Sequence, residues 1–310
     1  MLKIRLGTRS SALARTQSGW VADRIKEVSP GVTIETVLIE TGGDQDQVTP
    51  LHEVGSPGVF TAEVESALAR EEIDVAVHSL KDLPVVQPPE LTIAAIPPRE
   101  DPLDAWISSD YPGMVDVPAG GVIATGSLRR SAQILHKYPH LKVAGIRGNV
   151  DTRLRLHAER GDAGLMLACA GLKRLGLEDR IRSSLLPTEI TPAPGQGALA
   201  IEVRSNHEEL ISIISELDHL PTRRCVEAER SLLLAFGGGC HLPVGAYAVS
   251  SEHQITICGA LGLPDGSRLI RLGLEGSFDD PVGLGEKLAE LIKKAGGDEI
   301  LAQLAAEWDQ

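Results

Sequence analysis

The chain has 310 residues, enough for two or three domains with hydrophobic cores of their own. Its hydrophobic content of 42% is ordinary for a globular protein, and its formal net charge of -13 argues against general binding to nucleic acids or anionic membranes. Local clusters of arginine are therefore informative, because they run against the overall sign of the charge.

The N-terminal segment has no apolar run followed by a cleavage site, and no apolar stretch reaches membrane-spanning length. The cysteines show neither a CxxC pair nor zinc-ribbon spacing; they are Cys169, Cys225, Cys240 and Cys258. We therefore expect a cytoplasmic protein with reduced thiols.

The first elements predicted are a strand over residues 2–7, a helix from about 12 to 28 and a strand over 33–39. Ser10 or Ser11 can cap the helix, whose N-terminus is a natural anion site with Arg9 beside it. The alternative is a simple cap with a solvated arginine. A long polar loop follows up to residue 58, and loops of that length are usually functional or mobile.

Residues 74–84 are the stretch around which we expect the rest to be organised. An apolar run with β-branched residues predicts a buried strand, and Pro84 ends it. Lys81 and Asp82 then lie at the strand's carboxyl end, where ligands bind in open α/β sheets. The alternative is a surface pair of opposite charges that closes the strand.

A pattern of strand, small or hydroxyl residue, arginine and helix then occurs three times. Its basic residues are Arg129 with Arg130, Arg147 with Arg153, and Lys173 with Arg174. Alternating β and α segments predict a parallel sheet with crossover helices, which brings each strand end to one edge. A single arginine of this kind is expected on a solvated helix surface. Because the pattern places arginines at the ends of three successive strands, it favours an anion site. Arg129 and Arg130 diverge by roughly 100° on a helix and need not face the same ligand.

Two Pro/Gly-containing hinges, at about 98–102 and 192–197, bracket this middle unit. They indicate a chain that crosses to a second domain and returns to the first, with a ligand cleft between the two. Strands over 244–249, 254–261 and 268–274 and a helix from about 282 to 295 predict a third, α+β domain. The expected domains are 1–98 plus 198–216, 102–192 and 220–310.

Cys240 follows three glycines and precedes His241. It can be a nucleophile that carries a covalent group, half of a metal site, or a structural residue. Metal is the weakest of these alternatives, because no other Cys/His set has ligand spacing. The glycine-rich setting brings the nucleophile level with the structural alternative. Cys169, at a strand end, is expected in the core.

Motifs spread over nearly the full length resemble those of the porphobilinogen deaminase (hydroxymethylbilane synthase) family. No single motif decides this, but their order and spacing are specific. They are Gly7–Ala14, Thr41–Asp44, His78–Pro84, Arg99–Pro102, Gly126–Arg130, Arg147–Val150, Pro194–Ala198 and Gly238–Cys240.

The resemblance implies two α/β domains similar to type II periplasmic binding proteins, a central cleft and a small α+β C-terminal domain. It also implies a dipyrromethane cofactor attached by a thioether to Cys240. Such an enzyme joins four porphobilinogen units into hydroxymethylbilane with release of ammonia. We accordingly expect a monomer with a small-molecule substrate and no nucleic-acid, membrane or metal partner.

By the same resemblance Asp82 is the catalytic residue. A carboxylate held against a pyrrole N–H stabilises the positive charge that develops when ammonia leaves. Arginines suit the acetate and propionate groups of each ring, because they bind carboxylates in a forked geometry and stay charged. The implied cofactor-binding residues are Lys81, Asp82, Thr125, Ser127, Arg129, Arg130 and Arg153. The implied substrate-binding residues are Arg9, Ser11, Arg147, Arg153, Arg174 and Gln196.

Many of these sequence features also fit a protein of another class. Two α/β domains, two hinges and an edge lined with arginine also suit a non-catalytic anion-binding protein of the periplasmic-binding type. The glycine-rich segment before Cys240 and the third domain are additions that a simple binder does not need.

Overall fold

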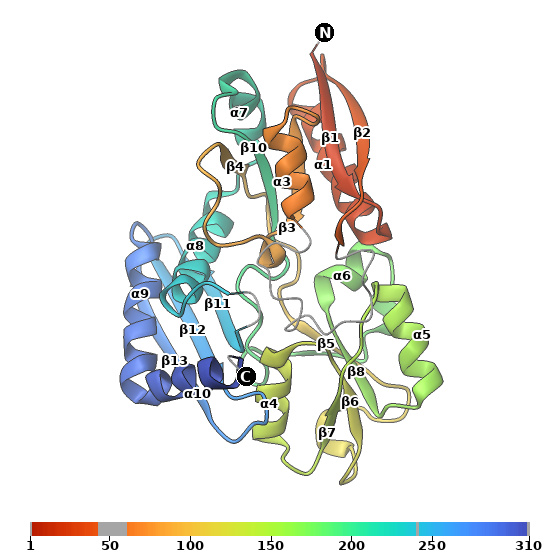
Figure 1. Cartoon of the computed structure of the whole chain (residues 1–310), viewed down its shortest axis with the longest axis vertical. Helices are drawn as coiled ribbons and strands as arrows, with labels where there is room; N and C mark the ends of the chain where they lie inside the picture. Colours follow the sequence, from red (N-terminus) through yellow and green to blue (C-terminus); the bar gives the residue numbers. More distant parts are fainter. Residues whose placement is uncertain (1, 43–60, 240–241, 309–310) are drawn as a thin grey trace.

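The computed structural model describes residues 2–42, 61–239 and 242–308. Within them lie two five-stranded sheets and one three-stranded sheet. Figure 1 shows the first sheet at the top, the second at the lower right and the third at the lower left, with α8 between the first and the third. The predicted class, two α/β units with a smaller α+β unit, is confirmed. Most of the loop expected to be functional, together with Cys240 and His241, lies outside the described residues.

The first sheet combines the beginning of the chain with a strand from far along it. Its strands, in sheet order, are β2 (Thr33–Ile39), β1 (Lys3–Arg9), β3 (Val75–Ser79), β10 (Leu199–Arg204) and β4 (Leu91–Ala95). β1 runs parallel to β2 and β3, whereas β10 runs antiparallel to both of its neighbours. The chain thus returns to its first sheet after the second hinge. The domain boundaries themselves stay predictions.

The second sheet is built from the middle of the chain. Its strands, in sheet order, are β7 (Lys142–Ala144), β6 (Val122–Ala124), β8 (Gly164–Ala168), β5 (Asp104–Ile107) and β9 (Ser183–Leu185). β5 and β9 had no counterpart in the sequence prediction. The three predicted strands, β6, β7 and β8, run parallel to one another as predicted. The unpredicted β5 runs antiparallel to both of its neighbours, β8 and β9. β5 and β10 each follow a Pro-containing linking segment rather than a crossover helix, so they enter their sheets in the opposite direction.

The third unit packs helices on one face of an antiparallel sheet. Its strands are β11 (Val244–Ser250), β12 (Gln254–Gly262) and β13 (Leu269–Ser277), and its helices are α8 (Leu220–Ala235), α9 (Pro281–Ile292) and α10 (Asp298–Trp308). Leu232, Ile257, Leu288 and Ile300 meet in its core and are buried. The helix expected to end near 295 continues into α10 across a kink at Gly296, whose φ of 106° suits glycine.

The other helices lie close to their predicted positions. They are α1 (Ala12–Val28), α3 (Ala62–Ala69), α4 (Leu128–Lys137), α5 (Val150–Arg160), α6 (Cys169–Arg174) and α7 (Glu208–Ser215). Ser11 caps α1, since its hydroxyl accepts a hydrogen bond from the Ala14 N–H, and Ser127 caps α4 in the same way. In the part of the chain that the structure describes, no helix has both the length and the apolar character needed to cross a membrane.

Candidate active site

The segment Leu80–Asp82 forms a single 3₁₀ turn directly after β3. The prediction placed Asp82 at the end of the strand itself, but β3 ends at Ser79. Two hydrogen bonds hold the N-terminal end of the turn. Ser79 Oγ accepts one from Gln17 Nε2 at 3.0 Å, and the Leu80 N–H donates one to Ala198 O at 3.0 Å. Leu80 is fully buried, so the turn has an apolar base and presents Lys81 and Asp82 above it.

Lys81 is a cation whose pKa is lowered by its surroundings. Burial lowers the pKa of Lys81 to about 8, Asp82 opposes that shift, and Arg130 adds to it. Around neutral pH the ammonium is still charged. Among the described residues, no hydrogen bond is made to the carboxylate of Asp82, so its oxygens can accept one from a ligand.

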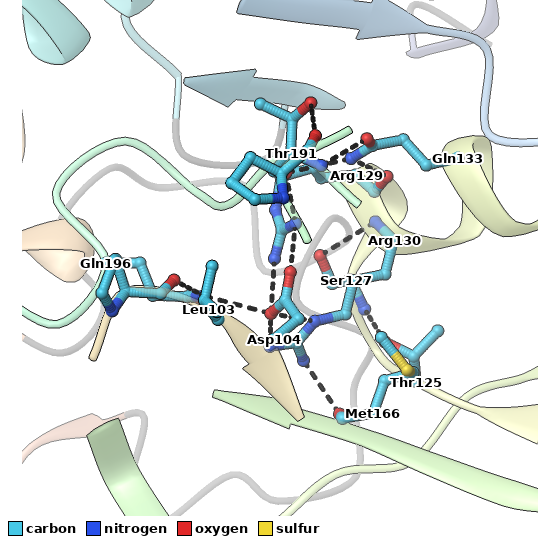
Figure 2. A network of polar contacts seen from close by, with 12 residues as sticks. Leu103, Asp104, Thr125, Ser127, Arg129, Arg130, Gln133, Met166, Thr191 and Gln196 are labelled. Atoms are coloured by element: carbon cyan, nitrogen blue, oxygen red, sulfur yellow. Dashed lines mark hydrogen bonds and ion pairs between the residues drawn. The ribbon is translucent and has the colours of Figure 1, made fainter. Parts of the chain in front are cut away.

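Figure 2 shows the feature that the sequence did not reveal: Asp104, the first residue of β5, is completely buried between Arg129 and Arg130. Arg129 Nη1 lies 2.7 Å from Asp104 Oδ2, and Arg130 Nη2 lies 2.6 Å from Asp104 Oδ1. Burial alone would raise the pKa of Asp104, but the two guanidinium groups hold it far below its usual range.

Of the two alternatives for these arginines, the structure excludes the solvated helix surface, since Arg129 and Arg130 are each only 5% exposed. Although they are adjacent on α4, both reach the carboxylate of Asp104 from its first turn. Each also donates to a backbone carbonyl, Arg129 to Thr191 O and Arg130 to Met166 O. Two cations on one carboxylate leave an excess of positive charge in a buried place.

Gln196 joins the second hinge to the same cluster (Figure 2). Its Nε2 donates to Pro102 O at 2.7 Å and to Asp104 Oδ1 at 3.1 Å. Its Oε1 is buried and has no hydrogen-bond partner among the described residues. A buried amide oxygen of this kind is available to an N–H donor of a ligand.

Thr125 and Ser127 shape the loop that leads into α4. The Ser127 N–H donates to Thr125 Oγ1 at 3.2 Å, and Ser127 Oγ accepts from the Arg130 N–H at 3.4 Å. Thr125 is only 3% exposed, so its first role in this structure is to fix the loop. The loop in turn sets the direction in which Arg130 leaves the helix.

Arg153 and Arg147 belong to the same electrostatic neighbourhood as Asp82. Burial lowers the pKa of Arg153 to about 10; Arg130 and Arg147 lower it further, and Asp82 opposes the shift. Arg153 Nε donates to Gly148 O at 2.6 Å, which fixes the guanidinium at the start of α5. Nη1 of Arg147 is buried and has no partner among the described residues. A carboxylate oxygen of a ligand would satisfy it.

The remaining predicted residues have other contacts in the structure. Arg174 Nη2 donates to Gly197 O at 2.8 Å and its charged neighbour is Glu100, so the structure associates it with the hinges rather than with Asp82. Arg9 is the last residue of β1, which runs parallel to β3, and Ser11 caps the helix that follows. Cys240, the predicted attachment residue, lies outside the described residues. Cys169 is buried as expected, and burial raises its pKa to about 11.

The site as a whole is rich in cations. Lys81, Arg130, Arg147 and Arg153 are linked to one another or to Asp82 by the electrostatic effects described above, and Arg129 adds a fifth positive charge through Asp104. In the described part of the chain, the carboxylates that oppose them are those of Asp82 and Asp104. In a chain with a net charge of -13, this local excess suits a ligand that carries several carboxylates.

Comparison with known proteins gives a consistent result over nearly the whole chain. The family model described as "Porphobilinogen deaminase, dipyromethane cofactor binding domain" matches residues 4–212, and the model of the C-terminal domain of the same family matches residues 223–294. A porphobilinogen deaminase of Brevibacillus brevis is 43% identical over 312 residues, covering 100% of each chain. One from Staphylococcus carnosus is 43% identical over 310 residues, covering 99% of this chain and 100% of the relative.

Among solved structures, the chain is similar to a putative methionine-binding lipoprotein from Bacillus subtilis. The similarity covers 69% of this chain and 89% of that chain, with a TM-score of 0.44 and 12% identity. Likeness of this degree says nothing about what the chain binds.

The fold and the local excess of positive charge are those expected of an α/β protein with an anionic ligand, a class that includes both enzymes and non-catalytic binders. The family matches distinguish between them. The chain belongs to the porphobilinogen deaminase family, whose members are transferases of tetrapyrrole synthesis with a dipyrromethane cofactor. The non-catalytic alternative is therefore not favoured.

The residues present fit that cofactor. A dipyrromethane carries carboxylate side chains and pyrrole N–H groups, so it needs buried cationic donors and at least one acceptor. Lys81, Arg130 and Arg153 would supply the cations that hold it, and Asp82 would supply an acceptor. The unpartnered Nη1 of Arg147 and Oε1 of Gln196 leave a further donor and a further acceptor among the described residues.

Proposed function

We propose that the chain is a hydroxymethylbilane synthase, in which Asp82 is the catalytic carboxylate and the cationic side chains around it bind the carboxylates of the pyrrole chain. The bound dipyrromethane would supply the pyrrole carbon onto which units are added. We further propose Cys240 as its point of attachment, on the resemblance of Gly238–Cys240 to the family motif.

The observation that carries this proposal is the setting of Asp82. Its carboxylate has no hydrogen bond from the described residues, and its charge opposes the lowering of the pKa of two nearby cations, Lys81 and Arg153. When ammonia leaves porphobilinogen, positive charge spreads onto the pyrrole nitrogen. Asp82 can accept the pyrrole N–H and stabilise that charge where it develops.

The cations divide into two groups by their existing contacts. Arg147 has an unpartnered donor, so we propose that it binds a substrate carboxylate directly. Arg129 and Arg130 already pair with Asp104, so we propose that they present their surplus positive charge to the cofactor. For the remaining predicted residues, namely Arg9, Ser11, Thr125, Ser127, Arg174 and Gln196, the binding roles stay proposals.

The net charge of -13 supports a protein that does not bind nucleic acids, and the thiols of Cys169, Cys225 and Cys258 are free. On these grounds we propose a cytoplasmic monomer that acts on porphobilinogen.

The proposal is tested first by the intact mass of the purified protein beside that of Cys240→Ser. The expected result is an excess mass of two linked pyrrole units in the natural protein and none in the variant. A folded protein that shows no excess even after incubation with porphobilinogen would contradict the covalent cofactor.

The role of Asp82 is tested with Asp82→Asn, which keeps the shape and removes the charge. Turnover should fall by about a thousandfold, because the loss of one preorganised group at a developing charge typically costs 10²–10³. Arg147→Ala should instead stall elongation. Full activity in Asp82→Asn would remove this residue from the mechanism.

A further inference from the structure

Arg230 on α8 reaches out of the third unit and binds the segment that carries Lys81 and Asp82. Nη1 donates to Leu83 O at 3.0 Å and to Leu80 O at 3.3 Å. Nη2 donates to Pro84 O at 2.7 Å and to Val85 O at 3.2 Å. One guanidinium group therefore binds four carbonyl oxygens of one short segment.

These four carbonyls define the backbone around Asp82. Leu80 and Leu83 are the residues on either side of the Lys81–Asp82 pair, and the Leu83 N–H also donates to Leu80 O at 3.2 Å. Carbonyl dipoles that converge on one point repel one another unless a cation with several donors lies between them. The planar fork of arginine provides such donors in a fixed geometry, which a lysine cannot reproduce.

The apolar contacts of the segment lead to the same helix. Val226, one turn before Arg230 on α8, is fully buried in a cluster with Leu80 and Leu83. Val85 packs against the core of the third unit. The base of the turn is thus fixed by α8 on both its polar and its apolar side.

The rest of α8 is itself held in place. Glu229, the neighbour of Arg230, accepts hydrogen bonds from the Gly195 N–H of the second hinge at 2.7 Å and from the Ala248 N–H of β11 at 2.8 Å. A shift of α8 would therefore be transmitted to the turn through Arg230. Among the described residues, Gln17 and Ala198 anchor the Ser79–Leu80 side, and on the other side Gln87 Nε2 donates to Pro84 O at 2.5 Å.

We propose that Arg230 is a positioning residue for Asp82: it fixes the backbone on both sides of this residue, and thereby the distance between the carboxylate and the pyrrole N–H. This rests on the catalytic role of Asp82 proposed above. Arg230 contacts backbone oxygens of the turn, so it acts on the rate of the chemical step and not on the binding of substrate carboxylates.

The test compares Arg230→Met, Arg230→Lys and the control Arg224→Met, with kcat measured per mole of protein that carries the cofactor, as counted by intact mass. Arg224 lies on the same helix and forms a partly buried ion pair with Glu227. A misplacement of about 1 Å can cost about a hundredfold in rate, so kcat of Arg230→Met should fall by about that factor with KM nearly unchanged. Arg230→Lys should fall between it and the natural protein, and Arg224→Met should match the natural protein.

The double variant Asp82→Asn/Arg230→Met separates positioning from a merely structural role. If Arg230 acts through Asp82, the double variant should be no slower than Asp82→Asn alone. The proposal would be overturned if the losses in kcat of the two single variants multiply in the double variant. It would also be overturned if Arg230→Met has a normal kcat and only a lowered melting temperature. If Arg230→Met fails to fold or to load the cofactor, an undiminished kcat in Arg230→Lys overturns it instead. Asp82→Asn in the same assay reports independently on the proposed function, because full turnover there would refute the role of Asp82 itself.

Discussion

Arg99 and Glu229 form a buried, two-pronged ion pair, with Nη1 2.7 Å from Oε1 and Nη2 3.0 Å from Oε2. Arg99 lies in the segment that joins the first sheet to the second, and Glu229 lies on α8. The same arginine donates through Nε to Gln196 O in the second hinge. One ion pair therefore connects both linking segments to the third unit.

Glu229→Gln should destabilise the protein strongly. The side chain of Glu229 is 0% exposed and that of Arg99 is 10% exposed, so the change leaves a nearly buried guanidinium without its counter-charge. Removing one partner of a buried pair costs about 3–5 kcal/mol in the free energy of unfolding. Urea unfolding of Glu229→Gln, Arg99→Met and the double variant measures this cost. Strictly additive losses would show that the two side chains do not depend on each other.

Asp104→Asn should leave Arg129 and Arg130 with an uncompensated excess of positive charge. We expect a loss of about 3–5 kcal/mol in the free energy of unfolding, since both guanidinium groups are buried. A carboxylate-bearing ligand supplies the missing charge, so porphobilinogen should raise the melting temperature of this variant more than that of the natural protein. Asp110→Asn, at an exposed carboxylate, is the control. An equal gain in both proteins would mean that the cluster does not face the ligand.

Lys81 should make ligand binding sensitive to pH. Its pKa is lowered to about 8, mainly by burial, so the fraction that is charged falls as the pH rises through this value. A neutral amine binds carboxylate weakly, and the rate at which the cofactor-free protein assembles its cofactor from porphobilinogen should therefore fall above pH of about 8. Lys81→Arg keeps its charge and should lose this alkaline decline. A decline that persists in Lys81→Arg would assign it to another group.

Gly197→Ala should test how closely the two hinges pack. Gly197 has a φ of 86°, and a Cβ at this position would collide with the carbonyl oxygen of Glu100. Its own carbonyl accepts hydrogen bonds from the Glu100 N–H and from Arg174. We expect the free energy of unfolding to fall by at least about 1–3 kcal/mol, the usual cost of a non-glycine residue in this region.

The matched control is Gly19→Ala. Gly19 lies inside α1 with no atom near its missing Cβ, so alanine should raise stability there by up to about 1 kcal/mol. A neutral Gly197→Ala would show that the hinge segments separate at little cost.

The sequence by itself determined most of the elements and the family. β6 and α1 lie at their predicted positions, because hydrophobic period, caps such as Ser11 and breaking prolines act over a few residues. The repeated strand-then-arginine pattern also predicted which loops would carry cations. These signals are local, so one chain without coordinates is enough to detect them.

Only the tertiary structure decided how the charges are used. Asp104 lies 25 residues before Arg129 in the chain, and no local pattern marks it as the partner of two arginines. An aspartate that opens the apolar run Ala105–Ile107 was the one available signal of a buried carboxylate. The antiparallel entry of β5 places it there, and that direction depends on pairing with β8.

The contact of Arg230 with the turn around Asp82 spans about 150 positions of the chain, from α8 back to Leu80. Periodicity predicted a helix near Arg230 and a strand before Asp82, but it carries no information about which helix lies against which turn. That depends on the buried packing of Val226 with Leu80 and Leu83, a long-range contact that forms only when the third unit lies against the first. The sequence therefore predicted which residue types lie at the site. The tertiary structure determined which residues they contact and how their pKa values are shifted, because both depend on long-range packing.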